Sequence, residues 1–355
     1  MIKKIVIVLP LLGHGGGQRK MSLLANEWSS AGHSVTILSL RKGSSFFELN
    51  DVVKLECLDY SEISQAKGSK RLFSRVKTFL DLRKALKASS PDLIISILSS
   101  TNILTIVSSL GLRSKVFVWD VMSPFRFRTP LEKLSRKVLY PIPDQIIVNT
   151  NRAKEVVSRE ISREPLVFPP PVVLPTEDFK IGERHKTLIS VGRLHPDKGH
   201  EDFLMICSKL DLKGWKIIIL GEGDQRVKLE TQAKELGISE HLEMPGAVTN
   251  VEDWLKDASI FCFTSKSESF GLSLVEAMSF GLPVISFDCE VGPREIIRDG
   301  RNGFLIPMND IDSYVSRLRM LMKDKELRKS LGQTGIDDAK KYDVKLISKR
   351  ILEKC

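Results

Sequence analysis

Short runs of apolar, mostly β-branched residues recur along the chain, separated by longer stretches with helical spacing. Continuous apolar runs of this kind are typical of strands buried on both faces of a parallel sheet. Their alternation with helices is typical of doubly wound α/β domains. Strands are expected at 4–10, 34–40, 93–98, 115–119 and 145–149, and again at 187–192, 215–220, 260–263, 283–287 and 303–307.

The alternation is interrupted at residues 168–186, which are rich in proline and charge and lack periodicity. Such a stretch indicates an interdomain linker. We therefore predict an N-terminal Rossmann-like domain over 1–170 and a C-terminal one over 171–340. A final helix over 341–355 is expected to pack back on the first domain. A length of 355 residues also suits two domains better than one.

The first apolar run, residues 5–12, follows two lysines and so imitates a signal peptide. It is short and leads into GHGGGQRK rather than a cleavage site, so a first buried strand is the better interpretation. No other stretch approaches the roughly 20 apolar residues of a spanning helix.

The cysteines form no Cys-x-x-Cys pair, which argues against structural zinc and disulfides and indicates a reduced, cytosolic protein. They are Cys57, Cys207, Cys262, Cys289 and Cys355.

Positive charge is concentrated in the first half of the chain. Residues 1–175 hold 26 Lys and Arg against 14 Asp and Glu, whereas residues 176–355 hold 28 against 30. Residues 67–87 and the basic-aromatic stretch 124–137 would suit an anionic membrane surface. In 67–87, helical spacing relates Leu72, Val76, Phe79 and Leu86. A solvated face of a core-packed helix is the alternative, and no nucleic-acid-binding motif accompanies the charge.

Three glycines at 15–17 follow the first expected strand. Gly16 and Gly17 would let the backbone approach a ligand, and the helix that follows presents its N–H groups there. Arg19 and Lys20 come where a dinucleotide fingerprint would have another glycine, so this loop is not that motif. An ordinary strand-to-helix turn remains the alternative.

Arg193 and Lys198 lie on the loop after the first strand of the second half. A guanidinium and an ammonium on one loop suit a diphosphate, because Arg binds two oxygens at once and Lys acts as a point charge. Two solvated charges are the alternative. Gly221, in GEGD after the next strand, would line a base pocket with backbone groups, or form a simple turn.

Two glutamates enclose the run SFGLSLV after the strand at 260–263. Glu268 lies just before an expected helix and Glu276 about one and a half turns inside it. One carboxylate suits sugar hydroxyls and the other a ribose. Between them, the N–H groups of Phe270, Gly271 and Leu272 would face phosphate at the helix N-terminus. The alternative is a charge favoured by the helix dipole and an exposed helix residue. No cluster of ligands with metal spacing is present, so no metal or other cofactor is expected.

In order, GHGGGQRKMSLLA, VGRLHPDKG, GEGD, SESFGLSLVEAMSFGLPVIS and GPREIIRDGRNGFLIP resemble the retaining glycosyltransferases of family 4, with the GT-B fold. The likeness covers most of the chain and is strongest over 187–307. It implies two Rossmann-like, doubly wound domains facing a cleft, with the acceptor on the first and a nucleotide-sugar donor mainly on the second. Such enzymes usually need no metal.

The resemblance also implies roles for individual residues. Arg193 and Lys198 would neutralise the leaving diphosphate, which is electrostatic stabilisation of the transition state. Glu268 would bind the donor sugar and Glu276 the ribose, while Gly16 would approach the diphosphate from the other domain. Relatives often carry a histidine or a Glu-Arg-Asn group after the strand at 115–119. Here the sequence is VWDVMSP, and Asp120 is the candidate for that polar role.

SSTNILTIVSS and DCEVGPREII are similar to the bacterial branch that builds surface polysaccharides and lipid-linked oligosaccharides. This likeness implies a UDP-hexose or UDP-N-acetylhexosamine donor and a saccharide acceptor on polyprenyl diphosphate. It also implies an enzyme peripherally bound to the cytoplasmic face of the plasma membrane. Two alternatives stay open: a nucleotide-sugar 2-epimerase with the same fold, and a non-catalytic membrane-binding subunit.

Overall fold

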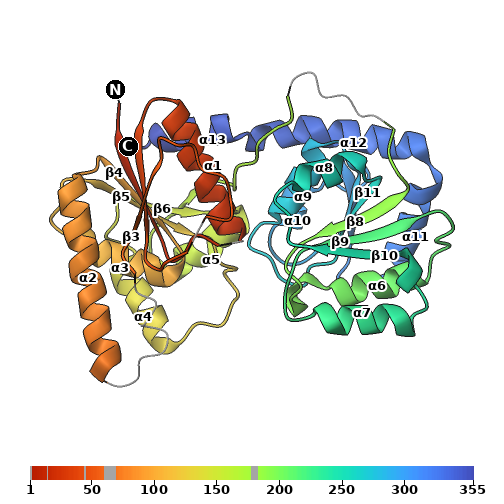
Figure 1. Cartoon of the computed structure of the whole chain (residues 1–355), viewed down its shortest axis with the longest axis horizontal. Coiled ribbons are helices and arrows are strands. Elements are labelled where there is room, and N and C mark those ends of the chain that lie inside the picture. Colours follow the sequence, from red (N-terminus) through yellow and green to blue (C-terminus); the bar gives the residue numbers. More distant parts are fainter. Residues whose placement is uncertain (1, 14, 44, 60–68, 177–182) are drawn as a thin grey trace. The chain divides into compact units, whose positions relative to one another are not determined.

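The computed structural model divides the chain into two compact units, drawn in Figure 1. It describes residues 2–13, 15–43, 45–59, 69–176 and 183–355, with the side chains of 69–73 left aside. The first unit comprises residues 1–171 and 344–355, and the second comprises residues 172–343. Residues 177–182 of the expected linker lie outside the described part.

The first unit is built on a seven-stranded parallel sheet with the order β3-β2-β1-β4-β5-β6-β7. Its strands are β1 (Lys4–Leu9), β2 (Ser34–Ser39), β3 (Lys54–Cys57), β4 (Leu93–Ile97), β5 (Lys115–Asp120), β6 (Gln145–Val148) and β7 (Leu166–Val167). Its helices are α1 (Gly16–Ser30), α2 (Ser69–Ser89), α3 (Ser99–Ser109), α4 (Pro130–Leu139), α5 (Asn151–Ile161) and α13 (Val344–Leu352).

The second unit is built on a six-stranded parallel sheet with the order β10-β9-β8-β11-β12-β13. Its strands are β8 (Thr187–Val191), β9 (Lys216–Leu220), β10 (Leu242–Gly246), β11 (Ile260–Phe263), β12 (Val284–Phe287) and β13 (Gly303–Ile306). Its helices are α6 (His200–Ser208), α7 (Arg226–Glu235), α8 (Val251–Asp257), α9 (Leu272–Ser279), α10 (Pro293–Ile296), α11 (Ile311–Lys323) and α12 (Lys325–Ala339). Short 3₁₀ turns occupy Pro196–Lys198, Ser239–His241 and Lys340–Tyr342.

Each sheet has apolar clusters on both faces, as expected for parallel strands covered by helices. All ten predicted strands are confirmed, and so are the two doubly wound parallel sheets. The sequence missed β3, β7 and β10, which are edge strands. All four residues of β3 are exposed, β7 has two residues, and β10 contains Pro245 and exposed Glu243. An edge strand needs no continuous apolar run, so the pattern does not reveal it.

The C-terminal helix α13 packs on α1 of the first unit, with Ile347 and Ile351 in the core cluster around β1. The indole Nε1 of Trp28 on α1 donates a hydrogen bond of 3.3 Å to the Ser348 carbonyl. The last residues of the chain therefore complete the core of the unit that its first residues begin.

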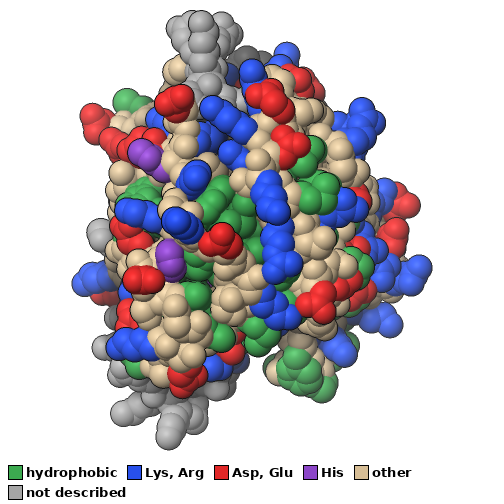
Figure 2. Space-filling model, turned by 90° about the vertical axis from the view of Figure 1, so that its right-hand side faces the viewer, with side chains coloured by type: hydrophobic (Ala, Val, Ile, Leu, Met, Phe, Trp, Pro, Cys, Tyr) green, Lys and Arg blue, Asp and Glu red, His purple; other side chains and the backbone are tan. Residues whose placement is uncertain are grey.

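Residues 69–87 of the basic stretch form most of α2, whose buried side chains include Thr78, Leu82 and Leu86, while residues 67 and 68 lie outside the described part. Val76 is exposed and Phe79 half-buried, while the side chain of Leu72 lies outside the described residues. Of the apolar positions named for this helix, Leu86 is the one found fully buried among those described. The helix is thus packed on the core through a stripe shifted from the predicted one. On the face of the molecule seen in Figure 2, Lys and Arg are interspersed with Asp and Glu.

Candidate functional site

The loops that carry the candidate donor residues follow β8 and β11, which are neighbours in the second sheet. The strand order reverses between them, because β9 and β10 extend to one side and β12 and β13 to the other. In open α/β sheets, ligands bind beyond the carboxyl ends of the strands at this switch point. The topology therefore brings two loops far apart in sequence to the expected place.

The two loops are joined through their backbones. The amide of Lys266 donates to the carbonyl of Asp197 at 2.8 Å, and Thr264 Oγ1 donates to the carbonyl of Lys198 at 3.3 Å. Gly199 has a φ of +63°, and a Cβ there would lie 2.1 Å from the Thr264 carbonyl oxygen. Only glycine permits this approach, so Gly199 fixes the separation of the loops.

As a result, Lys198 and Glu268 form an ion pair. The Nζ of Lys198 lies 2.5 Å from Oε1 of Glu268, and the side chains are 22% and 9% exposed. The methylenes of Lys198 extend past Gly192, where a Cβ would touch them at about 3.5 Å. A mostly buried pair interacts more strongly than a surface pair, so each side chain has a defined direction.

Arg193 is exposed on the loop that carries Lys198. The backbone beside it is tied to the loop after β9, since the amide of Leu194 donates to the Glu222 carbonyl at 3.0 Å. A Cβ on Gly221 would lie 1.9 Å from the Gly192 carbonyl oxygen, and φ there is +147°. The structure thus gives Gly221 a packing role beside the Arg193 loop; its part in a base pocket stays a prediction.

Helix α9 begins directly after the loop of Glu268. Its N-cap residue is Gly271, with a φ of +98°, and no side chain caps the first turn. The ring of Phe270 is buried against Tyr342, and its carbonyl oxygen would lie 1.9 Å from a Cβ on Gly292. Phe270 therefore offers its backbone rather than its side chain. Uncapped N–H groups and the helix dipole make this end suited to an anion.

Glu276 lies in the second turn of α9 and is half-buried, as is Leu272 in the first turn. The helix predicted for this stretch is confirmed, and both glutamates belong to one loop-helix element. Glu268 is held by Lys198, whereas Glu276 is carried by the helix itself. The two carboxylates therefore have different environments, which fits two different tasks.

Two buried groups beside the ion pair were not singled out from the sequence. Burial lowers the pKa of His200 to about 4, and the nearby positive charge of Lys198 adds to this effect. Burial raises the pKa of the Cys289 thiol to about 12, with the Glu268 carboxylate adding to it. Both side chains are thus neutral near neutral pH. The sequence does not show whether a histidine at the start of a helix is buried, so the place of His200 beside Lys198 is visible only in the structure.

In the first unit, Gly16 opens α1 and is exposed, while Gly17 packs close to Ile97. The amino end of α1 has no side-chain cap and no acidic residue in its first turn. This end lies after β1, whose neighbour β4 marks the switch point of the first sheet. The geometry suits an anion, as in the second unit.

Asp120 ends β5 and is buried, with Oδ2 2.6 Å from Nη1 of Arg136. The same guanidinium binds both oxygens of Glu160, at 2.9 Å and 3.0 Å. Asp120 thereby anchors α4, which carries Arg136. That Asp120 also guides the acceptor stays a prediction.

A further buried cation, Lys20, lies near Asp120. Its Nζ is 3.4 Å from the ring centroid of Trp119, and the indole Nε1 of Trp119 donates to Asn149 Oδ1 at 2.9 Å. Burial lowers the pKa of Lys20 well below its usual value, against the attraction of Asp120. In the sequence, Lys20 is notable only for breaking a fingerprint, because its partner Trp119 lies in β5, about a hundred residues later.

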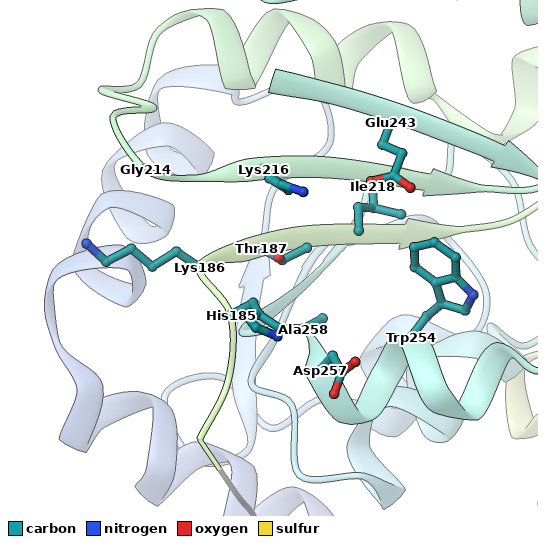
Figure 3. Close-up of a pocket in the computed structure, with 10 residues that line it drawn as sticks. All are labelled: His185, Lys186, Thr187, Gly214, Lys216, Ile218, Glu243, Trp254, Asp257 and Ala258. Carbon is teal, nitrogen blue, oxygen red and sulfur yellow. The ribbon is translucent and has the colours of Figure 1, made fainter. Parts of the chain in front are cut away.

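A cavity of about 320 Å³ lies elsewhere in the second unit, shown in Figure 3. Thr187 and Lys216, the first residues of β8 and β9, line it together with Ile218, Trp254 and Asp257. It is therefore near the amino ends of these strands, whereas the loops of Lys198 and Glu268 follow carboxyl ends. The candidate donor residues take no part in it.

Within the described residues, no group of three or more His, Cys, Asp and Glu side chains is arranged to hold a metal ion. None of the helices in the described ranges has the length and apolar character of a membrane span.

Comparison with known proteins finds a family model that is similar to most of the second unit. Residues 176–338 match the family model described as glycosyl transferases group 1. A Campylobacter jejuni protein is 28% identical over 99% of this chain and 97% of its own length. It is named GalNAc-alpha-(1->4)-GalNAc-alpha-(1->3)-diNAcBac-PP-undecaprenol alpha-1,4-N-acetyl-D-galactosaminyltransferase.

Two solved structures show the same fold. The lipopolysaccharide outer core galactosyltransferase WaaB, in its apo form, has a TM-score of 0.75 and 22% identity, covering 99% of this chain and 98% of that one. HepE of Anabaena, in complex with UDP and glucose, has a TM-score of 0.81 and 17% identity, with the same coverage. The GT-B fold expected from the sequence is thereby confirmed.

Proposed function

We propose that this protein is a retaining glycosyltransferase, since residues 176–338 match the family model described as glycosyl transferases group 1. It moves a hexose or N-acetylhexosamine from a UDP-sugar to a saccharide carried on a polyprenyl diphosphate, in surface-polysaccharide assembly. The observation that carries the proposal is the Lys198–Glu268 ion pair next to the uncapped amino end of α9.

The diphosphate of the donor would lie between the Arg193–Lys198 loop and the first turn of α9. Lys198 and Arg193 supply positive charge, and the first turn of α9 supplies N–H groups that no side chain caps. Charge develops on the diphosphate as its bond to the sugar breaks, so these donors act most strongly in the transition state. The leaving phosphate then helps to take the proton of the acceptor hydroxyl.

Glu268 and Glu276 would hold the two sugars of the donor. Glu268 accepts hydrogen bonds from the hydroxyls of the transferred sugar, and Glu276 from those of the ribose. When the donor binds, the Lys198 ammonium turns part of its interaction from Glu268 to phosphate. The pair is therefore the neutral resting form of a site that receives a dianion.

The acceptor and the donor sugar rest on the relatives. The Campylobacter jejuni protein is named for transfer to an undecaprenol-PP-linked saccharide, and the Anabaena structure holds UDP and glucose. No metal is needed in this proposal, since Arg193, Lys198 and the amino end of α9 take the part of a cation. Peripheral attachment to the inner face of the membrane would bring the enzyme to a lipid-linked acceptor.

The first test is isothermal titration of UDP, GDP and ADP in the presence of EDTA, with wild type, Lys198→Ala and Glu276→Ala. UDP binding that is lost in both variants supports the site, and a UDP-sugar screen with membrane extracts follows. Retention is checked by the anomeric coupling constant of the product in NMR. Preference for GDP would keep the site and change the donor.

Two results would overturn the proposal. Turnover of UDP-N-acetylglucosamine without any acceptor, yielding the 2-epimer, would make the protein an epimerase. No nucleotide binding by folded protein, together with no effect of Glu268→Ala beyond stability, would make it a non-catalytic subunit.

A further inference from the structure

Helix α4 and its flanks expose an unusual number of large apolar side chains. We call this set the α4 surface; its members are 45% to 84% exposed and comprise Phe125, Phe127, Leu131, Leu134, Val138 and Ile142. Single exposed apolar residues are normal, but six within 18 positions form a patch that needs an explanation.

The polarity of α4 is inverted relative to an ordinary surface helix. Leu131, Leu134 and Val138 recur at i, i+3 and i+7, which places them on one face, and all three are exposed. The one residue of α4 that is fully buried is Arg136. Arg136 contacts Asp120, Glu160 and the ring of Tyr140, so these ion pairs hold the helix on the unit together with the partly buried Leu139.

This anchoring leaves the apolar face turned away from the core. An apolar face exposed to water costs free energy unless something covers it. The helix cannot simply turn this face inward, because its opposite face carries the guanidinium that pairs with two carboxylates of the unit. The sequence thus places Arg136 inward and Leu131, Leu134 and Val138 outward on this helix. Such a distribution fits an element that lies at the boundary of an apolar medium.

Positive charge borders the same surface. Lys133 and Lys137 are exposed on α4, and the guanidinium of Arg152 lies 5.3 Å from the centroid of the Phe125 ring. Glu132, the acidic residue of α4, is paired with Arg126. Phenylalanine and leucine next to exposed lysines are typical of interfacial helices on anionic lipid.

We propose that the α4 surface inserts into the headgroup region of an anionic bilayer. This inference rests on the proposed function in one respect: a lipid-linked acceptor requires the enzyme to reach the surface of the bilayer. Leu131, Leu134 and Val138 enter the acyl boundary, and Phe125 and Phe127 anchor the preceding loop. Lys133 and Lys137 contact lipid phosphates.

The test is flotation of the full chain with vesicles of phosphatidylglycerol and phosphatidylethanolamine, and with vesicles of phosphatidylcholine. Wild type is expected to float with the anionic vesicles. The triple variant Leu131→Gln/Leu134→Gln/Val138→Gln should partition about 30-fold less, because it loses the apolar contribution. Lys133→Gln/Lys137→Gln should partition about tenfold less, and its residual binding should be less sensitive to salt than that of wild type.

A matched control replaces three exposed apolar residues on helices of the second unit, Met205→Gln/Val227→Gln/Met320→Gln. This control should float as wild type does. UDP titration is run on every variant as a test of folding. A variant of the α4 surface that is folded should keep the UDP affinity of wild type. If wild type floats with the anionic vesicles but does not bind UDP, the proposed function is refuted while membrane binding by the α4 surface remains supported.

Three outcomes would overturn the docking surface. The first is that wild type binds UDP but does not float with the anionic vesicles. The second is that the α4 triple variant floats to the same extent as its control. The third is a dimer of wild type, seen by light scattering in solution, that the α4 variant converts to a monomer. In that case the surface binds a second copy of the chain.

Discussion

Lys198 Nζ and Glu268 Oε1 lie 2.5 Å apart although 70 positions separate the two residues in sequence. The contact exists because β8 and β11 are adjacent and the loops after them share backbone hydrogen bonds. It makes the two charges interdependent, and we expect that removing Lys198 weakens nucleotide binding whereas removing Glu268 does not.

Lys198→Ala should weaken UDP binding and lower kcat/KM about 100-fold or more, because the diphosphate loses a charge-assisted partner. Glu268→Ala should leave UDP binding unchanged or tighter, since the ammonium is released from its partner, while sugar transfer is lost. Titration calorimetry and a transfer assay separate the two. Lys209→Ala, which removes an exposed ion pair with Asp312, is the control. Equal loss of UDP binding in Lys198→Ala and Glu268→Ala would contradict the interpretation.

Gly199→Ala should destabilise the second unit by about 2–4 kcal/mol, because it adds a backbone clash to left-handed strain. The relevant contact is the 2.1 Å approach of a Cβ to the Thr264 carbonyl oxygen. Gly214 has a φ of +74° and nothing within 4 Å of its Cβ position, so Gly214→Ala has strain alone and should cost about 1 kcal/mol. Urea unfolding measures both, and equal losses would show that the loop contact is unimportant.

His200 should make stability depend on pH. Its pKa is about 4 in the folded protein and near 6.5 when unfolded, so the unfolded chain takes up the proton first as pH falls. Its contribution is therefore complete above pH 6.5 and lost between pH 6.5 and pH 4, by about 3 kcal/mol. The free energy of unfolding of His200→Phe should fall less over this window than that of wild type. His241→Gln is the matched control and should fall as wild type does. If the free energy of unfolding of wild type falls no more steeply over this window than that of His200→Phe, the assignment is refuted.

Arg136→Met should cost about 3–5 kcal/mol, because it leaves the buried Asp120 carboxylate without its guanidinium. The double variant Asp120→Asn/Arg136→Met should recover part of this loss, since the unpaired charge is gone. Arg152→Ala, which removes an exposed pair with Glu155, should cost less than about 1 kcal/mol. Thermal unfolding compares the three, and a double variant no more stable than the single one would argue against a charge effect.

The sequence by itself determined the central strands, the helix that follows Glu268 and carries Glu276, and the resemblance of the second half to a glycosyltransferase family model. These features are local: a run of apolar residues or a loop before a helix has the same meaning wherever the chain carries it. The edge strands β3 and β10 escaped because exposed residues leave no such run.

Tertiary structure decided which of these features meet. Only the strand order brings Lys198 to Glu268, and only the close approach at Gly199 fixes their distance. The outward face of α4 was likewise hidden, because a sequence shows that apolar positions share a face but not which way it points. That direction was set by Arg136, whose partners Asp120 and Glu160 come from a strand and a helix on either side of it in sequence.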